Sequence, residues 1–330
     1  MKVLLAIPGH LKTVPMGRFT AEALQELGHD VVLFDYHAGA LDKIVDRVKR
    51  SDEEKASVNR RLRRVLESVC PDLFVTLFGF DISVESLAHM RRLGIPTACW
   101  WINDPFQYER SVKKAPHYDF VFSNSEVSAA QYRTLGVANA YFLPTACVPA
   151  VHRSVPLQER YRCDVCFAGD WSPLREQLME RLVGRFDLKI FGPWGSKMKP
   201  DSQLRAHLVD GFFSPADMAA MFSSARVVVN IHTWFGKFDH GLNPRLFEAA
   251  GCASFQVVDW KQEIPKLFDC PSEMACYRSL DEVPELIAGA LSAPDATRAT
   301  AAATQRRAYR DHTYKNRMQT LIDLVGKAGA

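Results

Sequence analysis

The chain has 330 residues, of which 47% are hydrophobic and 24% charged, as is typical of a soluble globular protein. This length exceeds the usual size of one hydrophobic core and predicts two domains of roughly 150 residues each. The formal net charge of +3 is too small to indicate a nucleic-acid-binding protein, although it allows weak attraction to an anionic membrane surface.

The amino terminus has only a faint likeness to a secretion signal. One basic residue, Lys2, precedes a short apolar run that ends at Pro8 and Gly9 without a small-residue cleavage site. We therefore interpret residues 2–7 as a first buried strand. No apolar stretch of the sequence has the length of a membrane span, and we expect a cytoplasmic protein.

The first half of the sequence alternates strand-like and helix-like runs, which predicts a parallel sheet covered by helices. The expected strands are 2–7, 30–36, 72–77, 96–102, 118–123 and 140–143. The expected helices are 18–27, 51–69 and 84–93, with one more between the last two strands. The arginines of helix 51–69 predict a solvated face, with a membrane or acceptor patch as the alternative.

A linker is expected near residues 145–160, where three prolines and a charged segment interrupt the alternation. The expected strands beyond it are 163–168, 188–191, 227–231 and 253–258. The expected helices are 173–183, 215–224, 244–250, 283–291, 296–310 and 314–325. We therefore predict two doubly wound, Rossmann-like α/β domains, 1–150 and 161–310, that face a central cleft. The segment 311–330 is expected to return to the first domain.

The eight cysteines are scattered through apolar segments, which predicts reduced and buried thiols in a cytoplasmic protein. Cys163 and Cys166 have the C-x-x-C spacing of some metal and redox motifs. They fall in a predicted strand, where positions i and i+3 face opposite sides, and no second cysteine pair has zinc-binding spacing. We therefore expect neither a metal nor a redox site there.

The segment 239–259 carries the most informative set of polar residues. Arg245 and Glu248 stand three residues apart on a short predicted helix, so both lie on one of its faces. They are near the helix start, where free backbone N–H groups and the helix dipole favour an anion. An arginine can bind a diphosphate, and a carboxylate can accept hydrogen bonds from two vicinal hydroxyls. The two side chains are therefore suited to binding a sugar nucleotide. The alternative is an ordinary helix with an Arg–Glu surface pair.

Other candidates follow predicted strands, where open α/β sheets bind ligands. Gly169 would let the backbone approach a phosphate, and Arg175 would supply charge from a helix that starts at Ser172-Pro173. Trp194 follows the next strand and would either stack on a ligand or simply pack. His232 follows a run of three valines, with a core or surface histidine as the equal alternative.

The order Asn243-x-Arg245-x-Phe247-Glu248, followed by a glycine and a strand, resembles the nucleotide-binding motif of GT-B glycosyltransferases. It is most similar to the CgeB-like, spore-maturation branch, which is related to glycosyltransferase families 1 and 4. Segments 167–175, 101–106 and 312–317 also resemble segments of that branch, and the resemblance is strongest over 163–317. It implies a donor site formed by Gly169, Arg175, Gly192, Trp194, His232, Asn243, Arg245 and Glu248.

The resemblance also suggests catalytic candidates. Retaining members of family 4 have two glutamates separated by seven residues, and this chain has His240 where the first would stand, so the stereochemical outcome stays open. In the first half, Asp104 and His10 follow predicted strands whose ends would face the cleft. Either would accept the acceptor's proton in an inverting reaction. For Asp104, which precedes a proline, a turn residue is the alternative.

The sequence contains no Asp-x-Asp, the pair that holds a divalent ion in metal-dependent transferases of the other main fold. We therefore expect no metal and no cofactor, with arginines and helix dipoles neutralising the leaving diphosphate. The expected partners are a nucleotide sugar, first a UDP-sugar, and an unidentified glycan, protein or small-molecule acceptor. A nucleic acid is not expected, and peripheral membrane contact stays open.

These observations predict a metal-independent glycosyltransferase whose N-terminal domain binds the acceptor and whose C-terminal domain binds the donor. One alternative is a GT-B-shaped protein that binds a sugar or nucleotide without transferring it, because the first glutamate of the pair is missing. The other is an NAD-dependent oxidoreductase, which the lack of Gly-x-Gly-x-x-Gly after the first strand disfavours.

Overall fold

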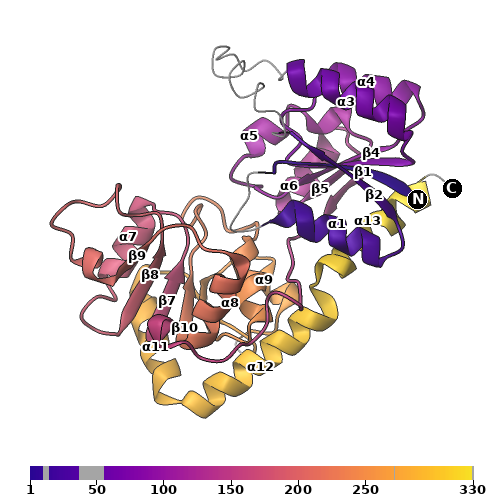
Figure 1. Cartoon of the computed structure of the whole chain (residues 1–330). Helices are drawn as coiled ribbons and strands as arrows, with labels where there is room; N and C mark the ends of the chain where they lie inside the picture. Colours follow the sequence, from indigo (N-terminus) through magenta and orange to yellow (C-terminus); the bar gives the residue numbers. More distant parts are fainter. Residues whose placement is uncertain (10–14, 37–55, 271, 329–330) are drawn as a thin grey trace. The chain divides into compact units, whose positions relative to one another are not determined.

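The computed structural model describes residues 1–9, 15–36, 56–270 and 272–328 (Figure 1). Within these residues the chain forms two compact units. The first contains residues 1–9, 15–144 and 314–328, and the second contains residues 145–313. The predicted helix 51–69 starts outside the described residues.

The first unit is built on a parallel sheet with the strand order β2-β1-β3-β4-β5-β6. Its strands are β1 (Lys2–Ile7), β2 (Asp30–Asp35), β3 (Leu73–Leu77), β4 (Thr97–Trp101), β5 (Phe120–Ser123) and β6 (Ala140–Phe142). Its helices are α1 (Met16–Glu26), α3 (Ala56–Val69), α4 (Val84–Arg92), α5 (Tyr108–Ser111), α6 (Glu126–Thr134) and α13 (Tyr314–Ala328). Helices α1 and α13 pack together on one face of the sheet, and α3 and α4 cover the other (Figure 1).

The second unit has a parallel sheet with the order β12-β11-β10-β7-β8-β9. Its strands are β7 (Cys163–Ala168), β8 (Leu188–Gly192), β9 (Leu208–Asp210), β10 (Ala225–Asn230), β11 (Gln256–Asp259) and β12 (Ala275–Tyr277). Its helices are α7 (Pro173–Glu180), α8 (Pro215–Ser224), α9 (Pro244–Gly251), α10 (Ile264–Leu267), α11 (Val283–Ser292) and α12 (Pro294–Asp311). In order along the chain, this is the 3-2-1-4-5-6 arrangement of a Rossmann-like sheet, which confirms the predicted fold.

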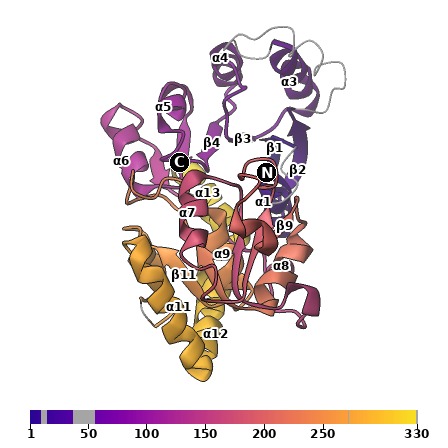
Figure 2. The same cartoon turned by 90° about the vertical axis from the view of Figure 1, so that its left-hand side faces the viewer.

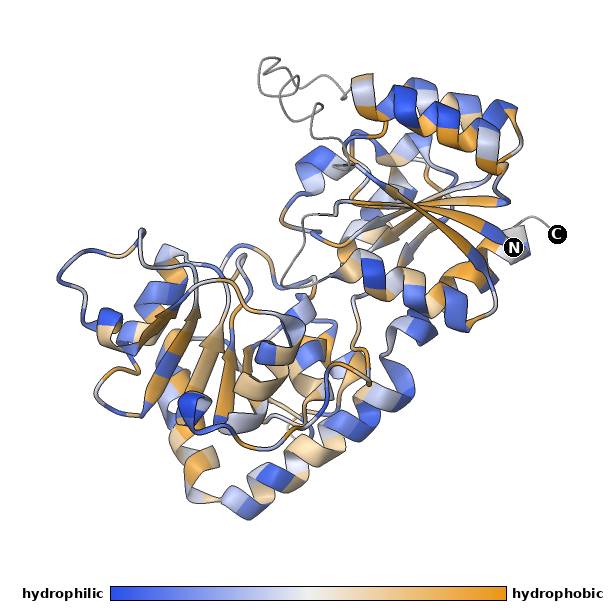
Figure 3. Cartoon of the chain, viewed as in Figure 1, coloured by the Kyte–Doolittle hydropathy of each residue, from blue (hydrophilic) through white to orange (hydrophobic). Residues whose placement is uncertain are grey.

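Alternate residues along the strands of the second sheet pack into two apolar layers, one on each face of the sheet. Val165 and Phe167 face the layer of α7 and α11, whereas Cys166 and Ala168 face that of α8 and α9. The strands are accordingly apolar along most of their length (Figure 3). Helices α11 and α12 lie side by side at the edge of this unit (Figure 2).

Three helices of the second unit start in the same way. Ser172, Ser214 and Asn243 precede α7, α8 and α9, and each is followed by a proline. In each case the capping side-chain oxygen accepts a hydrogen bond from a backbone N–H of the first turn. The predicted cap at Ser172-Pro173 is therefore confirmed, and α9 has the same kind of start.

The cysteine expectations need two corrections. Cys70 is exposed, and Cys270 and Cys276 are only partly buried. Cys163 and Cys166 do not separate to opposite sides, because both pack in the layer that contains α8. Burial raises the pKa of both thiols, to about 12 for Cys163, so they stay protonated at neutral pH. In the described part of the chain, no helix is both long and apolar enough to cross a membrane.

Candidate functional site

The strand order of the second unit reverses between β7 and β10. At such a switch point the connections leave the sheet in opposite directions, which opens a crevice at the carboxyl ends of the strands. Gly169 follows β7, and the segment 231–243 follows β10 and leads into α9. The predicted donor residues therefore gather around the position where this fold binds ligands.

Arg175, on the first turn of α7, joins the ends of β7 and β10. Its Nη1 donates to the carbonyl of Asp170 at 2.8 Å, and its Nη2 donates to the carbonyl of Ile231 at 3.1 Å and to Thr233 Oγ1 at 3.2 Å. Its Nε is buried and has no hydrogen-bond partner in the part of the chain that the structure describes. Among the described residues, no carboxylate lies within 4.0 Å of this guanidinium. Arg175 is therefore a partly buried cation without a direct ion-pair partner among the described residues, and Asp170 and Asp259 act on its charge only from a longer distance.

A second arginine adds to this positive charge. Burial lowers the pKa of Arg175 to about 10, and the charge of Arg245 acts in the same direction. Arg245 lies on α9, and its guanidinium is 5.7 Å from the ring centre of Phe222. The two guanidinium groups lie on the first turns of different helices, α7 and α9, and an anion that binds there would reduce the repulsion between them.

Arg245 and Glu248 form an ion pair on one face of α9, as their spacing predicted. The side chains are 15% and 3% exposed, so the alternative of a solvated surface pair is wrong. His152 is also buried near Glu248, and burial lowers the pKa of its imidazole. The sequence analysis missed His152 because it lies 96 residues before its neighbour, in a linker without regular structure.

Asn243 caps α9 and is itself held by two neighbours. Its Oδ1 accepts from the backbone N–H of Leu246 at 3.1 Å, and its Nδ2 donates to Asn230 Oδ1 at 2.8 Å. The Asn230 amide donates back at 3.1 Å. Asn243 therefore fixes the start of the helix to the end of β10, and the first-turn N–H groups of α9 keep one orientation.

His232 is not exposed to a ligand, contrary to its predicted place in the donor site. It is fully buried, and both ring nitrogens have protein partners. Nδ1 lies 2.6 Å from Asp259 Oδ1, and Nε2 accepts from the backbone N–H of Asn243 at 3.0 Å. Burial lowers the pKa of His232, so the ring is neutral with its proton on Nδ1. His232 positions Asn243 instead of contacting the donor.

Three buried charged residues that the sequence analysis did not single out hold the segment 232–243. Asp259 is the last residue of β11, and its Oδ1 accepts a hydrogen bond from the backbone N–H of His232 at 2.8 Å. Lys261 Nζ lies 2.9 Å from Asp259 Oδ2 and donates to the Phe238 carbonyl at 2.9 Å. Both carboxylate oxygens of Glu263 accept from the Gly241 N–H at 3.0 Å. We call Asp259, Lys261 and Glu263 the loop anchor.

Gly192 is required by the close approach of two loops. A Cβ atom at this position would lie 2.1 Å from the Gly169 carbonyl oxygen. The Trp194 indole also donates to that carbonyl, at 2.8 Å, and Trp194 is fully buried in the apolar layer. Trp194 therefore packs and cannot stack on a base, because neither face of its ring is accessible. This corrects its predicted role.

Phe212 is an aromatic residue with the opposite character. It is 75% exposed and follows Gly211, whose N–H donates to the Gly192 carbonyl at 3.3 Å. It therefore lies beside the loop that carries Gly192 and Trp194. The sequence signal was the Gly-Phe-Phe that follows β9, but this strand is only three residues long and was not predicted.

His10 and His240 are two of the predicted catalytic residues, and the structure describes only the second. His10 lies outside the described residues. His240 lies at the edge of the loop that the anchor holds, and its carbonyl accepts from the Trp234 indole at 2.9 Å. Burial lowers the pKa of the His240 imidazole, and the charge of Lys261 adds to this effect. A neutral imidazole at this place is suited to hydrogen bonding with a sugar, and this role stays a prediction.

The sequence and the fold both match known proteins. Residues 172–323, a little under half of the chain, match a family model described as glycosyl transferase-like. The matched segment contains α7, α9 and the loop anchor. The chain therefore has the GT-B fold, and its second unit contains a glycosyl transferase-like segment. This result favours neither the non-enzymatic alternative nor the NAD-dependent one.

Solved structures with the same fold cover nearly the whole chain. HepE from Anabaena, in a complex with UDP-glucose, is 12% identical, with a TM-score of 0.70 over 99% of this chain and 100% of that chain. A sucrose-phosphate synthase from Thermosynechococcus elongatus is 10% identical, with a TM-score of 0.72 over 99% of each chain. AviGT4, involved in avilamycin A biosynthesis, is 18% identical, with a TM-score of 0.66 over 100% of this chain and 99% of that chain. At these identities the matches show the fold. No curated protein matches the sequence.

In the first unit, Asp104 is buried and 1% exposed. Its carboxylate accepts hydrogen bonds from Ser111 at 2.9 Å, Ser123 at 2.8 Å and Tyr132 at 2.7 Å. These hydroxyls belong to α5, β5 and α6, so one carboxylate fastens three elements together. The structure does not support the predicted catalytic role, because an acceptor would have to displace these buried hydroxyls.

Asp104 should make the stability of the first unit depend on pH. Burial raises its pKa to about 6, whereas an unfolded chain gives up this proton near pH 3.9. The free energy of unfolding should therefore fall by about 3 kcal/mol as the pH rises from about 4 to above 6. Asp104→Asn should remove this fall, as urea unfolding of both proteins at pH 4 and pH 7 would show. An unchanged pH dependence in the variant would contradict this assignment.

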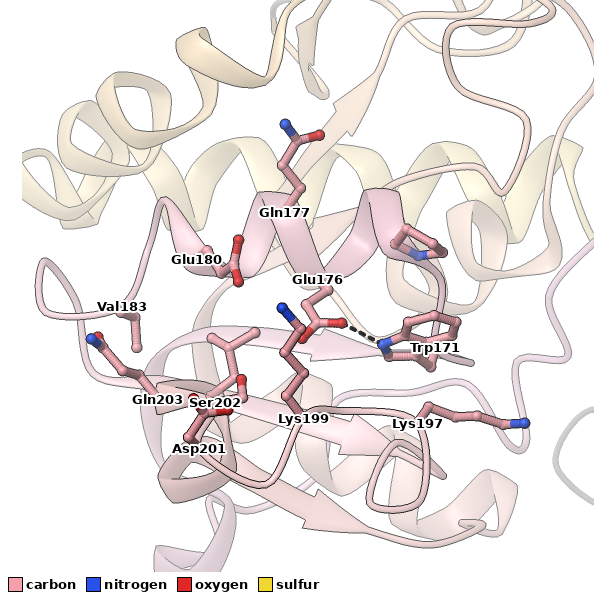
Figure 4. Close-up of a pocket in the computed structure, with 12 residues that line it drawn as sticks. Trp171, Glu176, Gln177, Glu180, Val183, Lys197, Lys199, Asp201, Ser202 and Gln203 are labelled. Carbon is pink, nitrogen blue, oxygen red and sulfur yellow. Dashed lines mark hydrogen bonds between the residues drawn. The ribbon is translucent and has the colours of Figure 1, made fainter.

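A polar groove of about 660 Å³ lies beside α7 (Figure 4). Glu176 points across it and accepts from the Trp171 indole at 2.7 Å, and Lys197 and Lys199 come from the opposite wall. None of the predicted donor residues lines this groove. Its carboxylates and ammonium groups are mixed, so it lacks an unpaired positive charge like that of Arg175.

Proposed function

We propose that this glycosyltransferase uses a nucleotide-sugar donor, with a UDP-sugar as the first candidate, and that its second unit binds the donor. The observation that carries the proposal is the guanidinium of Arg175 at the switch point of the sheet, which forms no ion pair with a carboxylate of the described residues. A diphosphate would neutralise it together with Arg245. The complex of the similar HepE with UDP-glucose supports this ligand class.

The proposed roles follow from the positions of the side chains. Arg175, Arg245 and the first-turn N–H groups of α9 bind the diphosphate. Glu248 accepts hydrogen bonds from the ribose hydroxyls, and Phe212 stacks on the base in place of Trp194. His240 lies near the transferred sugar. In the free protein Glu248 is paired with Arg245. Glu248 can bind the ribose only if some N–H groups of Arg245 reorient from Glu248 toward the diphosphate, so both side chains serve the ion pair and the donor.

The proposed chemistry is the transfer of a glycosyl group from the diphosphate to a hydroxyl of the acceptor. As the bond between the anomeric carbon and the phosphate oxygen breaks, negative charge develops on the leaving diphosphate. Preorganised arginines and helix N–H groups stabilise that charge without reorganising during the reaction. We propose that these groups act without a metal ion, since the sequence lacks an Asp-x-Asp pair. His10 remains our candidate for the group that accepts the acceptor's proton.

Finer assignments rest on the sequence motifs. We propose the CgeB-like branch because segments 101–106, 167–175, 243–248 and 312–317 resemble its motifs. We also propose that the first unit binds the acceptor and that the protein acts in the cytoplasm. Peripheral membrane contact would use the arginines of α3, which include Arg60, Arg63 and Arg64.

A thermal-shift screen of nucleotide sugars, nucleoside diphosphates and NAD tests the proposed ligand class. A ligand at 100 times its Kd adds about 2.7 kcal/mol to the free energy of unfolding. We expect a uridine or another nucleoside diphosphate, alone or with its sugar, to raise the melting temperature. A rise with NAD and with no nucleotide sugar would overturn the proposal.

Glu248→Ala should weaken donor binding by about ten- to a hundredfold, because a charge-assisted hydrogen bond is worth about 1.5–3 kcal/mol. Glu248→Gln keeps the shape and should weaken binding less. Calorimetric titration with the donor measures both effects. Glu285→Ala is a matched control, since Glu285 forms an exposed pair with Arg185 at 2.8 Å on the same unit.

A 2′,3′-dideoxy donor separates a ribose contact from a general loss of structure. The analogue should bind with nearly the same affinity to the wild type and to the Glu248 variants. If its affinity falls as much as that of the natural donor when Glu248 is replaced, Glu248 is a structural residue.

A further inference from the structure

Two partly buried cysteines of the second unit lie in contact. The Sγ atoms of Cys270 and Cys276 are 3.6 Å apart. Cys270 follows α10, and Cys276 is the central residue of β12. Both thiols are free in this structure and partly accessible, in contrast to the buried Cys163 and Cys166. Accessibility and proximity are the two conditions that a dithiol needs for exchange with a dissolved disulfide.

Glu273 connects the chain next to Cys270 to helix α12. The Asp269 N–H donates to Glu273 Oε2 at 2.7 Å, and Arg307 Nε donates to Glu273 Oε1 at 3.3 Å. The Thr304 hydroxyl of α12 donates to the Glu273 carbonyl. These contacts keep the two sulfurs near each other in the folded chain. A bond would require the sulfurs to approach by about 1.5 Å, to the usual S–S distance of about 2.05 Å.

The two thiols are also electrostatically unequal. A hydrogen bond from Cys276 lowers the pKa of the Cys270 thiol, whereas the same interaction and burial raise the pKa of Cys276. Cys270 is therefore the more readily deprotonated thiol of the two, and Cys276, in contact with it, is placed to react after it. In β12, Cys276 pairs with Val258 and the next residue, Tyr277, pairs with Asp259 of the loop anchor.

We propose that Cys270 and Cys276 form a reversible disulfide by exchange with a small-molecule disulfide such as oxidised glutathione. The Cys270 thiolate attacks one sulfur of the oxidant, its S–S bond breaks, and one glutathione thiolate leaves and takes up a proton. The Cys276 thiol then loses its proton to solvent and attacks the Cys270 sulfur, which releases the second glutathione. Two protein thiols are oxidised, and one external disulfide is reduced to two thiols. The modification site is independent of the proposed donor chemistry.

Peptide mass spectrometry of the full chain tests the proposal with an internal control. Trypsin gives one peptide, 267–278, that contains both Cys270 and Cys276, and another, 163–175, that contains Cys163 and Cys166. The native protein is equilibrated with oxidised and reduced glutathione at several ratios, acid-quenched, and alkylated after denaturation. We expect peptide 267–278 to lose the mass of two hydrogen atoms and to escape alkylation, reversibly with dithiothreitol. Peptide 163–175 should be alkylated at both cysteines.

Single variants show the order of the two steps. Cys276→Ser should trap glutathione on Cys270, and Cys270→Ser should leave Cys276 mostly unmodified. Two results would overturn the proposal. One is full alkylation of both cysteines at every glutathione ratio. The other is stable glutathionylation of wild-type Cys270 without closure onto Cys276.

Discussion

Asp259→Asn should lower the free energy of unfolding of the second unit by about 3–5 kcal/mol, the usual effect of breaking a buried ion pair. Asp259 and Lys261 are both fully buried, and Lys261 Nζ lies 2.9 Å from the carboxylate. Without that carboxylate charge, the ammonium would keep only the Phe238 carbonyl and the face of Phe235, 5.8 Å away. His232 would also lose the partner that fixes its tautomer.

A matched pair of variants separates the buried charge from a general sensitivity of the sheet. Asp164 pairs with Arg226 at 3.1 Å on the same sheet but is partly exposed, so Asp164→Asn should cost less than about 1 kcal/mol. Adding Lys261→Met to Asp259→Asn should recover part of the loss, because no unpaired charge then remains. Urea unfolding measures all four proteins. A loss below about 1 kcal/mol for Asp259→Asn would show that the anchor is not an ion pair that needs both partners.

The pH dependence of the anchor follows from the same contacts. Burial alone would raise the pKa of Asp259, but His232 and Lys261 outweigh it and hold the pKa below its ordinary value. The stability from this carboxylate is therefore complete above about pH 4 and is lost as the pH falls further through the folded pKa. Burial lowers the pKa of His232, so the neutral ring is the form that the folded state favours. The stability that this ring contributes is complete above about pH 6.5 and is lost as the pH falls below that value. Both effects make the second unit weaker in acid.

Arg175→Ala should reduce kcat/KM for the nucleotide sugar by about a hundredfold to a thousandfold. Arg175 would stabilise the charge that develops on the leaving diphosphate, and the loss of one such donor usually costs this much. Arg175→Lys keeps the positive charge but loses the guanidinium N–H groups that donate to the Ile231 carbonyl and to Thr233. We therefore expect an effect between those of the wild type and Arg175→Ala. Initial rates over a range of donor concentrations give kcat and KM for each variant.

Arg181→Ala is the control for charge on the same helix. Arg181 follows α7 and pairs with the exposed Asp281 at 3.1 Å, away from the switch point. Its replacement should leave kcat/KM within about twofold of the wild type, as is usual for an exposed pair. Equal effects of Arg175→Ala and Arg181→Ala would contradict a specific role for Arg175. Melting temperatures without donor show whether the loss of the Asp170 and Ile231 contacts unfolds the loops.

The sequence predicted the alternation of strands and helices well, but it missed two short strands. β9 and β12 each have three residues, and in neither does the burial pattern alternate. Both lie at the edges of the second sheet, where a strand has only one neighbour to define it. Their existence depends on pairing with β8 and β11, which local sequence does not encode.

The helix α9 and the shared face of its Arg–Glu pair were predicted correctly because that information is local. Arg245 and Glu248 share a face of the helix through their spacing alone. Trp194 and His232 were assigned wrongly because a position after a strand does not show whether a side chain faces solvent or the core. The loop anchor was missed for a related reason. Asp259, Lys261 and Glu263 act through contacts with the segment 232–243, and only the folded structure brings that segment beside them.

Calorimetric titration of UDP into the full-length protein, with EDTA present, tests the central claim most directly. The account predicts saturable binding at one site per chain without a metal ion. It also predicts that Arg175→Ala weakens this binding by at least about tenfold, whereas Arg181→Ala leaves it unchanged. Binding that EDTA abolishes in the intact wild-type protein would contradict the metal-independent site. Binding that is equally strong in Arg175→Ala and the wild type would show that the donor does not lie at the switch point of the second sheet.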